Sequence, residues 1–290
     1  MRTNSRCIAC VIGKQKKLIE QFDDTERKAE YIRRLEALLD ARDGTESTPQ
    51  LSERVDSLYR EFWGSGEDYG PLKKKYNDLL LEKEASLDIQ IRRTADPVRE
   101  CIKYVCAANY IDFSAVENVS EGTFEKLLER AKGEEVSPLE YGYFVQDLER
   151  AQRLVYLTDN CGEIVLDKLF IKFIKEAYPK LDITVIVRGA DVINDATMED
   201  AVQVGLTDIV RCIGSGCAVP GTVMSRLSAE ARAVLLGADV IISKGQGNFE
   251  SLFGEGLNPY FMFLCKCEMF TERFGLEQYS AVFSKEERIE

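Results

Sequence analysis

The sequence contains no histidine among its 290 residues. This absence excludes serine–histidine and cysteine–histidine nucleophile pairs, and it excludes imidazole as a general base. It also excludes the catalytic zinc sites that use histidine ligands. A metal in this protein is therefore expected to bind carboxylate and amide oxygens, which suit Mg²⁺ or Mn²⁺ and are tolerated by Co²⁺ or Ni²⁺.

Long apolar runs and an excess of basic residues are also lacking. No segment approaches the length of a membrane span, and MRTNSRCIACVIGKQKK at the start has too short an apolar stretch for a signal peptide. The net charge of −12 argues against non-specific nucleic-acid binding, which requires a basic face. Nine cysteines, an odd number, favour free thiols in a reducing compartment. We expect a cytoplasmic protein without nucleic-acid or membrane partners, whose oligomeric state the sequence does not indicate.

Apolar residues in the first half of the chain recur at helical spacings. Helices are expected within Gly13–Arg42, Leu51–Trp63, Leu72–Ile91, Val98–Ala108, Phe124–Ala131 and Leu139–Ala151. Asp43–Pro49 has the composition of a linker or turn. Asp96 is a candidate cap for the helix that begins near Pro97, and that helix is expected to end within Asn109–Asp112.

From Arg153 onward, short apolar runs alternate with helical patterns. The expected strands are Leu154–Leu157, Ile183–Val187, Ile209–Ile213, Val240–Ser243, Phe261–Cys265 and, as a further candidate, Ala281–Phe283. This alternation predicts an α/β fold, namely a three-layer α/β/α sandwich with a largely parallel sheet. We expect residues 1–150 to form an all-helical N-terminal region that packs on the core, and residues 151–290 to form the α/β domain that binds metal and phosphate.

The expected strands of the second half end in polar or glycine-rich clusters. The carboxyl ends of parallel strands share one edge of a sheet, which is where open α/β sheets bind ligands. We therefore expect a site assembled from several loops at this edge. The clusters are Thr158–Glu163, Arg188–Thr197, Gly214–Gly216 with Pro220–Thr222, and Ser243–Glu250.

Charge suggests a role for each candidate residue. Asp159, Asn160 and Asp195 would supply two negative charges and one carbonyl, a sparse set that suits a divalent cation sharing a substrate phosphate. Lys244 would add a positive charge for that phosphate, and metal and lysine together would stabilise the phosphoryl group while a metal-bound water attacks it. We expect these four residues to be catalytic. Further candidate phosphate contacts are Thr158, Gly162, Glu163, Arg188, Gly245, Gln246 and Asn248.

Ordinary structural roles compete with these assignments. An Asp-Asn turn or Asp195 before a helix can be a helix cap, and glycines at strand ends commonly serve turns. Asp167 and Asp200 lie a turn or more inside expected helices, so we expect them at the surface or as partners of the helix dipole. The coincidence of several clusters at one edge nevertheless favours a functional site.

The cysteines near the two ends of the chain pose a separate question. Cys7 and Cys10 with Cys265 and Cys267 could hold a structural zinc as four thiolates. Buried free cysteines are also common core residues, which is the competing interpretation. A redox-active pair is less favoured, because no βαβ pattern surrounds Cys7 and Cys10.

Several of these motifs together resemble a known family. Asp159-Asn160-Cys161-Gly162-Glu163, Asn194-Asp195-Ala196-Thr197 and Lys244-Gly245-Gln246-Gly247-Asn248 resemble the damage-control phosphatases, also called the domain-of-unknown-function-89 family. Cys7-x-x-Cys10, Asn109-x-x-Asp112 and Lys266-Cys267 resemble its microbial subgroup. The resemblance covers nearly the whole chain, with Tyr110 as one departure.

The resemblance implies an α/β/α sandwich with an added helical part. It implies a metal-dependent phosphatase that acts on small phosphorylated metabolites such as sugar phosphates or harmful side products. By motif match, the family's metal ligands fall on Asp159, Asn160 and Asp195, and its phosphate-binding lysine falls on Lys244. The resemblance also keeps open an S-adenosylmethionine-dependent carboxyl methyltransferase, with Gly214–Gly216 near its cofactor. A non-catalytic metal- or metabolite-binding protein is the third alternative. We favour direct attack by water over a covalent aspartyl intermediate.

Overall fold

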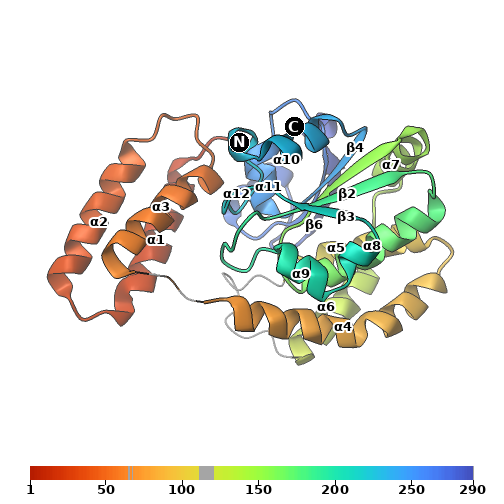
Figure 1. The fold of residues 1–290 in the computed structure, drawn as a ribbon, viewed down its shortest axis with the longest axis horizontal. Coiled ribbons are helices and arrows are strands. Elements are labelled where there is room, and N and C mark those ends of the chain that lie inside the picture. Colours follow the sequence, from red (N-terminus) through yellow and green to blue (C-terminus); the bar gives the residue numbers. More distant parts are fainter. Residues whose placement is uncertain (65, 67, 111–120, 290) are drawn as a thin grey trace.

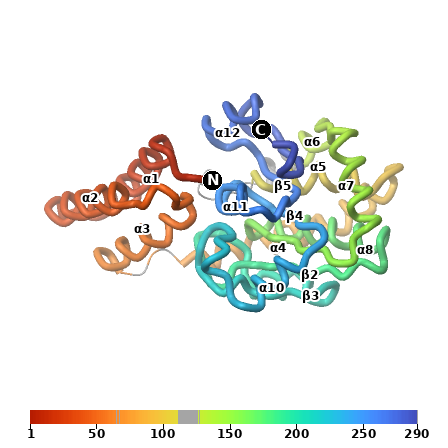
Figure 2. The backbone as a smooth tube through the Cα atoms, turned by 90° about the horizontal axis from the view of Figure 1, so that it is seen from above, coloured from red at the N-terminus to blue at the C-terminus, as the bar shows by residue number. Residues whose placement is uncertain are grey.

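The computed structural model describes residues 1–64, 66, 68–110 and 121–289. Three N-terminal helices, α1 (Ser5–Leu18), α2 (Thr25–Asp40) and α3 (Thr48–Trp63), form a unit beside the main body (Figure 1 and Figure 2). This unit has its own hydrophobic core, which includes Tyr31 and Leu35. None of the described helices is long and apolar enough to cross a membrane.

The N-terminal helices differ from the expected ones at their ends. The segment Gly13–Arg42 is divided, because α1 ends in a 3₁₀ turn and the side chain of Asp24 accepts a hydrogen bond from the Arg27 N–H at the start of α2. Helix α3 begins within the expected linker, because Ser47 caps it and Pro49 suits its first turn.

The next four helices belong to the main body. They are α4 (Gly70–Arg92), α5 (Pro97–Ala108), α6 (Glu121–Gly133) and α7 (Pro138–Arg150). The expected helices agree with these to within three residues at every end; α7 stops at Arg150, one residue before the expected end, and Asp96 caps α5 as predicted. The expected helix end at Ile111–Asp112 lies outside the described residues.

Six strands form one sheet in the order β3-β2-β1-β4-β5-β6. The five strands β1 to β5 are parallel, and β6 is antiparallel to β5, so the largely parallel sheet is confirmed. The third strand begins two residues later than expected, because a 3₁₀ turn at Leu206–Asp208 precedes it. The strands are β1 (Arg153–Leu157), β2 (Asp182–Val187), β3 (Arg211–Gly214), β4 (Val240–Lys244), β5 (Tyr260–Leu264) and β6 (Ala281–Lys285).

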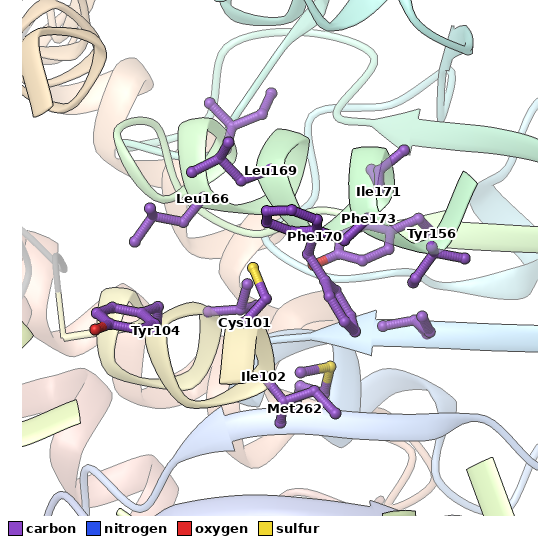
Figure 3. Packing of buried hydrophobic residues seen from close by; sticks show 14 of the residues in the cluster. Cys101, Ile102, Tyr104, Tyr156, Leu166, Leu169, Phe170, Ile171, Phe173 and Met262 are labelled. Carbon is purple, nitrogen blue, oxygen red and sulfur yellow. The ribbon is translucent and has the colours of Figure 1, made fainter. Parts of the chain in front are cut away.

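Helices cover both faces of the sheet, which confirms the three-layer sandwich. Alternate side chains of a strand point to opposite faces, so Tyr156 joins one core with Phe170, as Figure 3 shows, while Val155 joins another with Phe249. The first face carries α4 to α7 together with α8 (Glu163–Ala177) and α9 (Met198–Gln203). The second face carries α10 (Ala229–Leu236), α11 (Gln246–Leu252) and α12 (Glu268–Phe274).

The hydrophobic core of the first face shows how the helical half, residues 1–150, is divided between two cores. Helices α4 to α7 contribute to the same hydrophobic cluster as the sheet, whereas α1 to α3 enclose a separate cluster. The change at residue 150 is therefore a change of secondary structure within one layered body. The domain boundary at that position stays a prediction.

The strand order also locates the site. The helices that follow β1 and β2 lie on one face, and those that follow β3 and β4 lie on the other. The order of the strands therefore reverses between β1 and β4, and ligands of open α/β sheets bind at the carboxyl ends of two such neighbours. Thr158 follows β1 there, and Lys244 ends β4.

Candidate functional site

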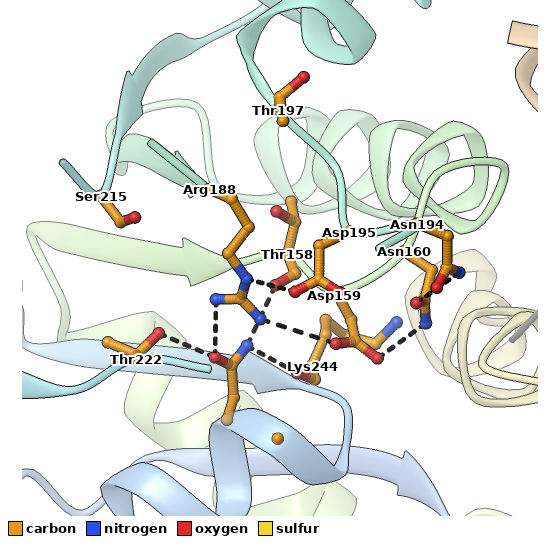
Figure 4. Close-up of polar contacts among 12 residues, drawn as sticks. Thr158, Asp159, Asn160, Arg188, Asn194, Asp195, Thr197, Ser215, Thr222 and Lys244 are labelled. Atoms are coloured by element: carbon orange, nitrogen blue, oxygen red, sulfur yellow. Dashed lines mark hydrogen bonds and ion pairs between the residues drawn. The ribbon is translucent and has the colours of Figure 1, made fainter. Parts of the chain in front are cut away.

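Two loops at this edge, after β1 and after β2, bring together the expected metal ligands. Asn160 and Asp195 pair as an isolated antiparallel bridge, and the Ala196 N–H donates to the Asp159 carbonyl at 2.7 Å. The guanidinium of Arg188 lies between the two carboxylates, with Nε 2.5 Å from Asp195 Oδ2 and Nη2 3.7 Å from Asp159 Oδ1 (Figure 4). The two loops and their acids thus converge as the sequence predicted.

The Asp159 carboxylate is held in a defined orientation although it is nearly buried. Its Oδ2 accepts hydrogen bonds from Asn109 Nδ2 at 2.9 Å and from Asn160 Nδ2 at 2.8 Å. Burial raises the pKa of Asp159 to about 8, and the charges of Asp195 and Glu163 act in the same direction. The ionised form of Asp159 is therefore disfavoured in the protein alone, although the charges of Lys266 and Arg188 act in the opposite direction.

The backbone of Gly245 lies directly against the carboxylate of Asp159. The Gly245 backbone has φ +80° and ψ 160°, a conformation that is almost confined to glycine. A Cβ at this position would lie 2.0 Å from Asp159 Oδ2 and 2.2 Å from Cγ. Glycine is therefore required here both by the backbone conformation and by the close approach of the carboxylate.

Asn248 connects the ends of β1 and β4 with Arg188. Its amide nitrogen donates to the carbonyls of Thr158 at 3.0 Å and Lys244 at 2.7 Å. Its amide oxygen accepts from Arg188 Nη1 at 3.0 Å and from the Thr222 hydroxyl at 2.8 Å. Because Asn248 is fully buried and fully bonded, it orients Arg188 and does not present a free group to a ligand.

Two side-chain nitrogens at the site lack a hydrogen-bond partner within the described part of the chain. They are Arg188 Nη2 and Gln246 Nε2, and both atoms are buried. Arg188 Nη2 lies 3.7 Å from Asp159 Oδ1, and buried donors are nearly always bonded in folded proteins, so both nitrogens are candidate donors to a ligand or to water. Anionic oxygens of a ligand would satisfy both.

Lys244 occupies a different position from the one expected for a phosphate contact. Its side chain is fully buried, and Nζ forms ion pairs with Glu163 and with Asp167, the latter at 3.0 Å. The Tyr156 hydroxyl donates to the same Asp167 oxygen at 2.6 Å. The ammonium group thus lies beneath the metal-ligand loops, where its charge compensates two buried carboxylates.

Three other expected phosphate contacts also have partners inside the protein. The Thr158 hydroxyl donates to the Ile186 carbonyl at 3.4 Å, and the Gly162 N–H donates to Asn77 Oδ1 at 2.6 Å. Glu163 is fully buried in its ion pair. These groups shape the loop from below, which differs from the direct contact with phosphate that the sequence suggested.

Neither Asp167 nor Asp200 lies at the surface, whereas the alternative role at a helix terminus is observed for Asp200, which caps the first turn of α9. Asp167 is fully buried, and Asp200 is 3% exposed and bonded to Thr197 and Lys73. Nothing in the sequence of α8 distinguishes Asp167 from its solvent-exposed charged residues, because the helix carries charges along its whole length. A buried carboxylate needs a cation, and Lys244 provides one.

Asn109 is the site residue that residue-by-residue reasoning missed. Besides Asp159, it donates to Glu163 Oε2 at 3.1 Å, and it accepts from the Leu264 N–H at 3.2 Å. Only the family resemblance pointed to it, through Asn109-x-x-Asp112, and Asp112 lies outside the described residues. A single asparagine at a helix end otherwise looks like an ordinary cap.

The cysteines do not form the zinc site considered above. In the described ranges no group of three or more cysteine, aspartate or glutamate side chains is arranged to hold a metal ion. All nine cysteines are free thiols, and Cys7 Sγ lies 3.7 Å from Met269 Sδ. Of the four cysteines considered for zinc, only Cys265 is a buried core residue, whereas Cys7 is half-buried and Cys10 and Cys267 are exposed. The expected oxygen site contains only two carboxylates, with one amide, so it does not count as a group of three such side chains.

The loop that a methyltransferase would use is packed against the protein. A Cβ on Gly189 would lie 2.3 Å from the Gly216 nitrogen, and one on Gly216 would lie 2.7 Å from Ser228 Cβ. The backbone of this loop therefore contacts neighbouring loops directly. No feature of Gly214–Gly216 favours cofactor binding over a tight turn.

Comparison with known proteins agrees with this geometry. A damage-control phosphatase of Archaeoglobus fulgidus is 28% identical over 288 residues, which cover 95% of this chain and 96% of the relative. A damage-control phosphatase of Pyrococcus horikoshii is 26% identical over 264 residues, with 87% and 86% of the two chains covered. The crystal structure of a DUF89 family protein from Pyrococcus horikoshii shares the fold, with a TM-score of 0.83, 24% identity and 99% of each chain covered.

The family is shown by a match that spans almost the whole sequence. The family model of the damage-control phosphatase ARMT1-like domain matches residues 3–282, which include every residue of the site described above. The resemblance inferred from the motifs is thereby confirmed. This chain belongs to the damage-control phosphatase ARMT1-like family.

Proposed function

We propose that this protein is a phosphatase that hydrolyses phosphate esters of small, damaged metabolites, among them sugar phosphates, and that it requires a divalent cation. One observation carries the proposal. Two nearly buried carboxylates, Asp159 and Asp195, meet across separate loops at the carboxyl edge of a parallel sheet. Relatives named damage-control phosphatases support the reaction class.

The residues present fit a divalent cation. Asp159 and Asp195 are 8% and 5% exposed; among the described residues the Arg188 guanidinium lies between them, and the charge of Lys266 also acts on Asp159. Buried carboxylates require compensation by a cation, and a further positive charge would relieve the raised pKa of Asp159. Carboxylate and amide oxygens are the ligands of Mg²⁺ and Mn²⁺, so Asp159, Asn160 and Asp195 would hold the ion.

The chain's own residues would orient these ligands. Asn109 and Asn160 fix the rotamer of the Asp159 carboxylate, and the Asn194 amide donates to Asn160 Oδ1 at 2.8 Å. When bound, the cation supplies Lewis-acid charge to phosphoryl oxygens and acidifies a water. Asn160 Oδ1 keeps a second lone pair for that ion.

The phosphate contacts follow from the two unsatisfied donors. Arg188 Nη2 and Gln246 Nε2 would donate to phosphoryl oxygens. Lys244 would act from beneath, because its ion pair fixes Glu163, whose carboxylate accepts from Asn160 Nδ2 at 3.1 Å. This role replaces the direct phosphate contact expected for Lys244.

A phosphate-release screen tests the proposal. The purified protein would be incubated with sugar and nucleotide phosphates, with Mg²⁺, Mn²⁺, Co²⁺ or Ni²⁺, and with EDTA as the metal-free condition. We expect release that depends on the added ion. Asp159→Asn and Asp195→Asn should each lower kcat/KM at least about a hundredfold, because each removes a charged ligand.

A matched substitution controls for the loss of an acidic residue. Asp182 is exposed at the amino end of β2, at the opposite edge of the sheet. Asp182→Asn should therefore leave activity unchanged. Full activity of Asp159→Asn with EDTA present would refute the cation requirement. Binding of phosphate esters without release from any of them would instead favour a non-catalytic binding protein.

A further inference from the structure

Side chains from a helix outside the sheet bond to residues in or directly after both ligand loops. The loops contact each other directly through Asn160, Asp195 and their neighbours. Helix α4, from the helical half of the chain, packs against α8 and α9, the helices that begin directly after these loops. Two of its side chains, Lys73 and Asn77, lie one helical turn apart and are 4% and 0% exposed. Polar side chains that are buried this deeply on a helix need specific partners.

Asn77 bonds to both loops with one amide. Its Oδ1 accepts from the Gly162 N–H at 2.6 Å, two residues after the expected ligand Asn160. Its Nδ2 donates to Asp200 Oδ1 at 2.8 Å and to Gln203 Oε1 at 2.9 Å, in the helix that follows the second loop. A planar amide has a fixed spacing between its oxygen and nitrogen, so it fixes the separation of these partners.

Lys73 contacts the second loop on both sides of the expected metal ligand Asp195. Its Nζ contacts Asp200 Oδ2 at 2.8 Å, Asp191 Oδ1 at 3.1 Å and Thr197 Oγ1 at 3.4 Å. Asp191 and Thr197 flank Asp195 in the sequence. One buried ammonium group therefore fastens the start and the end of the segment that presents the carboxylate.

We propose that Lys73 and Asn77 are positioning residues, which set the separation of Asn160 and Asp195 and thereby the affinity for the cation. Neither side chain bonds to Asp159, Asn160 or Asp195, or to the proposed phosphate contacts Arg188 and Gln246, so their effect is transmitted through Gly162 and Asp200. Partners that orient metal ligands typically change metal affinity 10- to 100-fold when they are removed. This inference rests on the proposed function for the identity of the site.

Cation affinity, measured apart from activity, tests the inference. The Kd for Mn²⁺ would be measured by calorimetry and by electron paramagnetic resonance for the wild type, Asn77→Leu and Lys73→Met. We expect both variants to raise Kd at least about tenfold. At saturating Mn²⁺ their kcat should return to within about threefold of the wild-type value, because the catalytic groups are intact. Lys74→Met is the matched control, since Lys74 lies on the exposed side of α4 and pairs with Asp78.

An exchanged pair protects the test against misfolding. Asn77→Asp alone places two carboxylates opposite each other, and should raise Kd. Combined with Asp200→Asn, it restores one amide facing one carboxylate, and Kd should recover at least threefold. A Kd within twofold of wild type in folded Asn77→Leu, or a loss of Tm alone, would overturn the inference. No Mn²⁺ binding by the wild type would instead refute the proposed cation site itself.

Discussion

The close approach of Gly245 to Asp159 leads to a sharp prediction for Gly245→Ala. The alanine Cβ would lie 2.0 Å from Asp159 Oδ2. Real Cβ atoms do not approach other heavy atoms closer than about 3 Å, so the carboxylate must move by about 1 Å. Its neighbours Asn109 and Asn160 then lose their hydrogen-bond geometry, and the carboxylate leaves the position it shares with Asp195.

The size of the effect follows from two separate contributions. Alanine in the backbone conformation of Gly245 costs about 1–3 kcal/mol of folding stability. A displacement of about 1 Å at a reacting centre costs about 100-fold in rate, or about 3 kcal/mol of transition-state stabilisation. We therefore expect a folded variant with slightly lower stability and with kcat/KM reduced by about two orders of magnitude.

A second glycine separates backbone strain from displacement. Gly275 ends α12 with φ +63°, and a Cβ there would meet no atom within 4 Å among the described residues. Gly275→Ala should lose about 1 kcal/mol in urea denaturation and keep full phosphatase activity. If Gly245→Ala keeps activity within threefold of wild type at saturating Mg²⁺, the position of the Asp159 carboxylate does not limit the reaction, and the reasoning fails.

Two further predictions concern the buried charges beneath the site. Lys244→Met should lower the free energy of unfolding in urea by about 3–5 kcal/mol, because it leaves Glu163 and Asp167 buried without their cation. The triple variant with Glu163→Gln and Asp167→Asn should recover most of this loss, and no loss in Lys244→Met would contradict the buried ion pair. Burial raises the pKa of Asp167 to about 6 even though Lys244 lies beside it, so the folded protein holds this proton more tightly than the unfolded chain does. As the pH rises from about 4 to 6, the wild type should therefore lose stability relative to Asp167→Asn, and a constant difference across this range would contradict the prediction.

The sheet and the gathering of its loops could be predicted from the sequence. Short apolar runs alternate with helical patterns, and parallel strands place their carboxyl ends at one edge. Asp159 and Asp195 therefore had to lie near each other once both followed parallel strands. Their approach needed no knowledge of side-chain packing.

The role of Lys244 could not be predicted from its position in the strand. A lysine at the end of β4 can extend to the surface or turn into the core, and strand periodicity does not decide between them. The direction depends on Glu163 and Asp167, which lie one turn apart on the buried side of α8. The sequence shows that Glu163 and Asp167 are four residues apart and so share a face of α8. Only the packing of α8 on the sheet shows that this face is buried.

The roles of Lys73 and Asn77 could not be predicted from the sequence either. Their partners are separated from them by 85 to 127 residues, and α4 also contains the exposed lysines Lys74 and Lys75. Charged residues on a helix are usually solvated. Only the placement of α4 across the two loops distinguishes Lys73 from Lys74.

The reversed direction of β6 determines how the protein can be handled in experiments. Ala281 pairs with Leu264 beside the site's edge, and the strand then runs to Lys285 beside Tyr260 at the opposite edge. Arg288 is anchored there to Glu140. An affinity tag or surface linker attached at the carboxyl end would therefore leave the catalytic rim accessible.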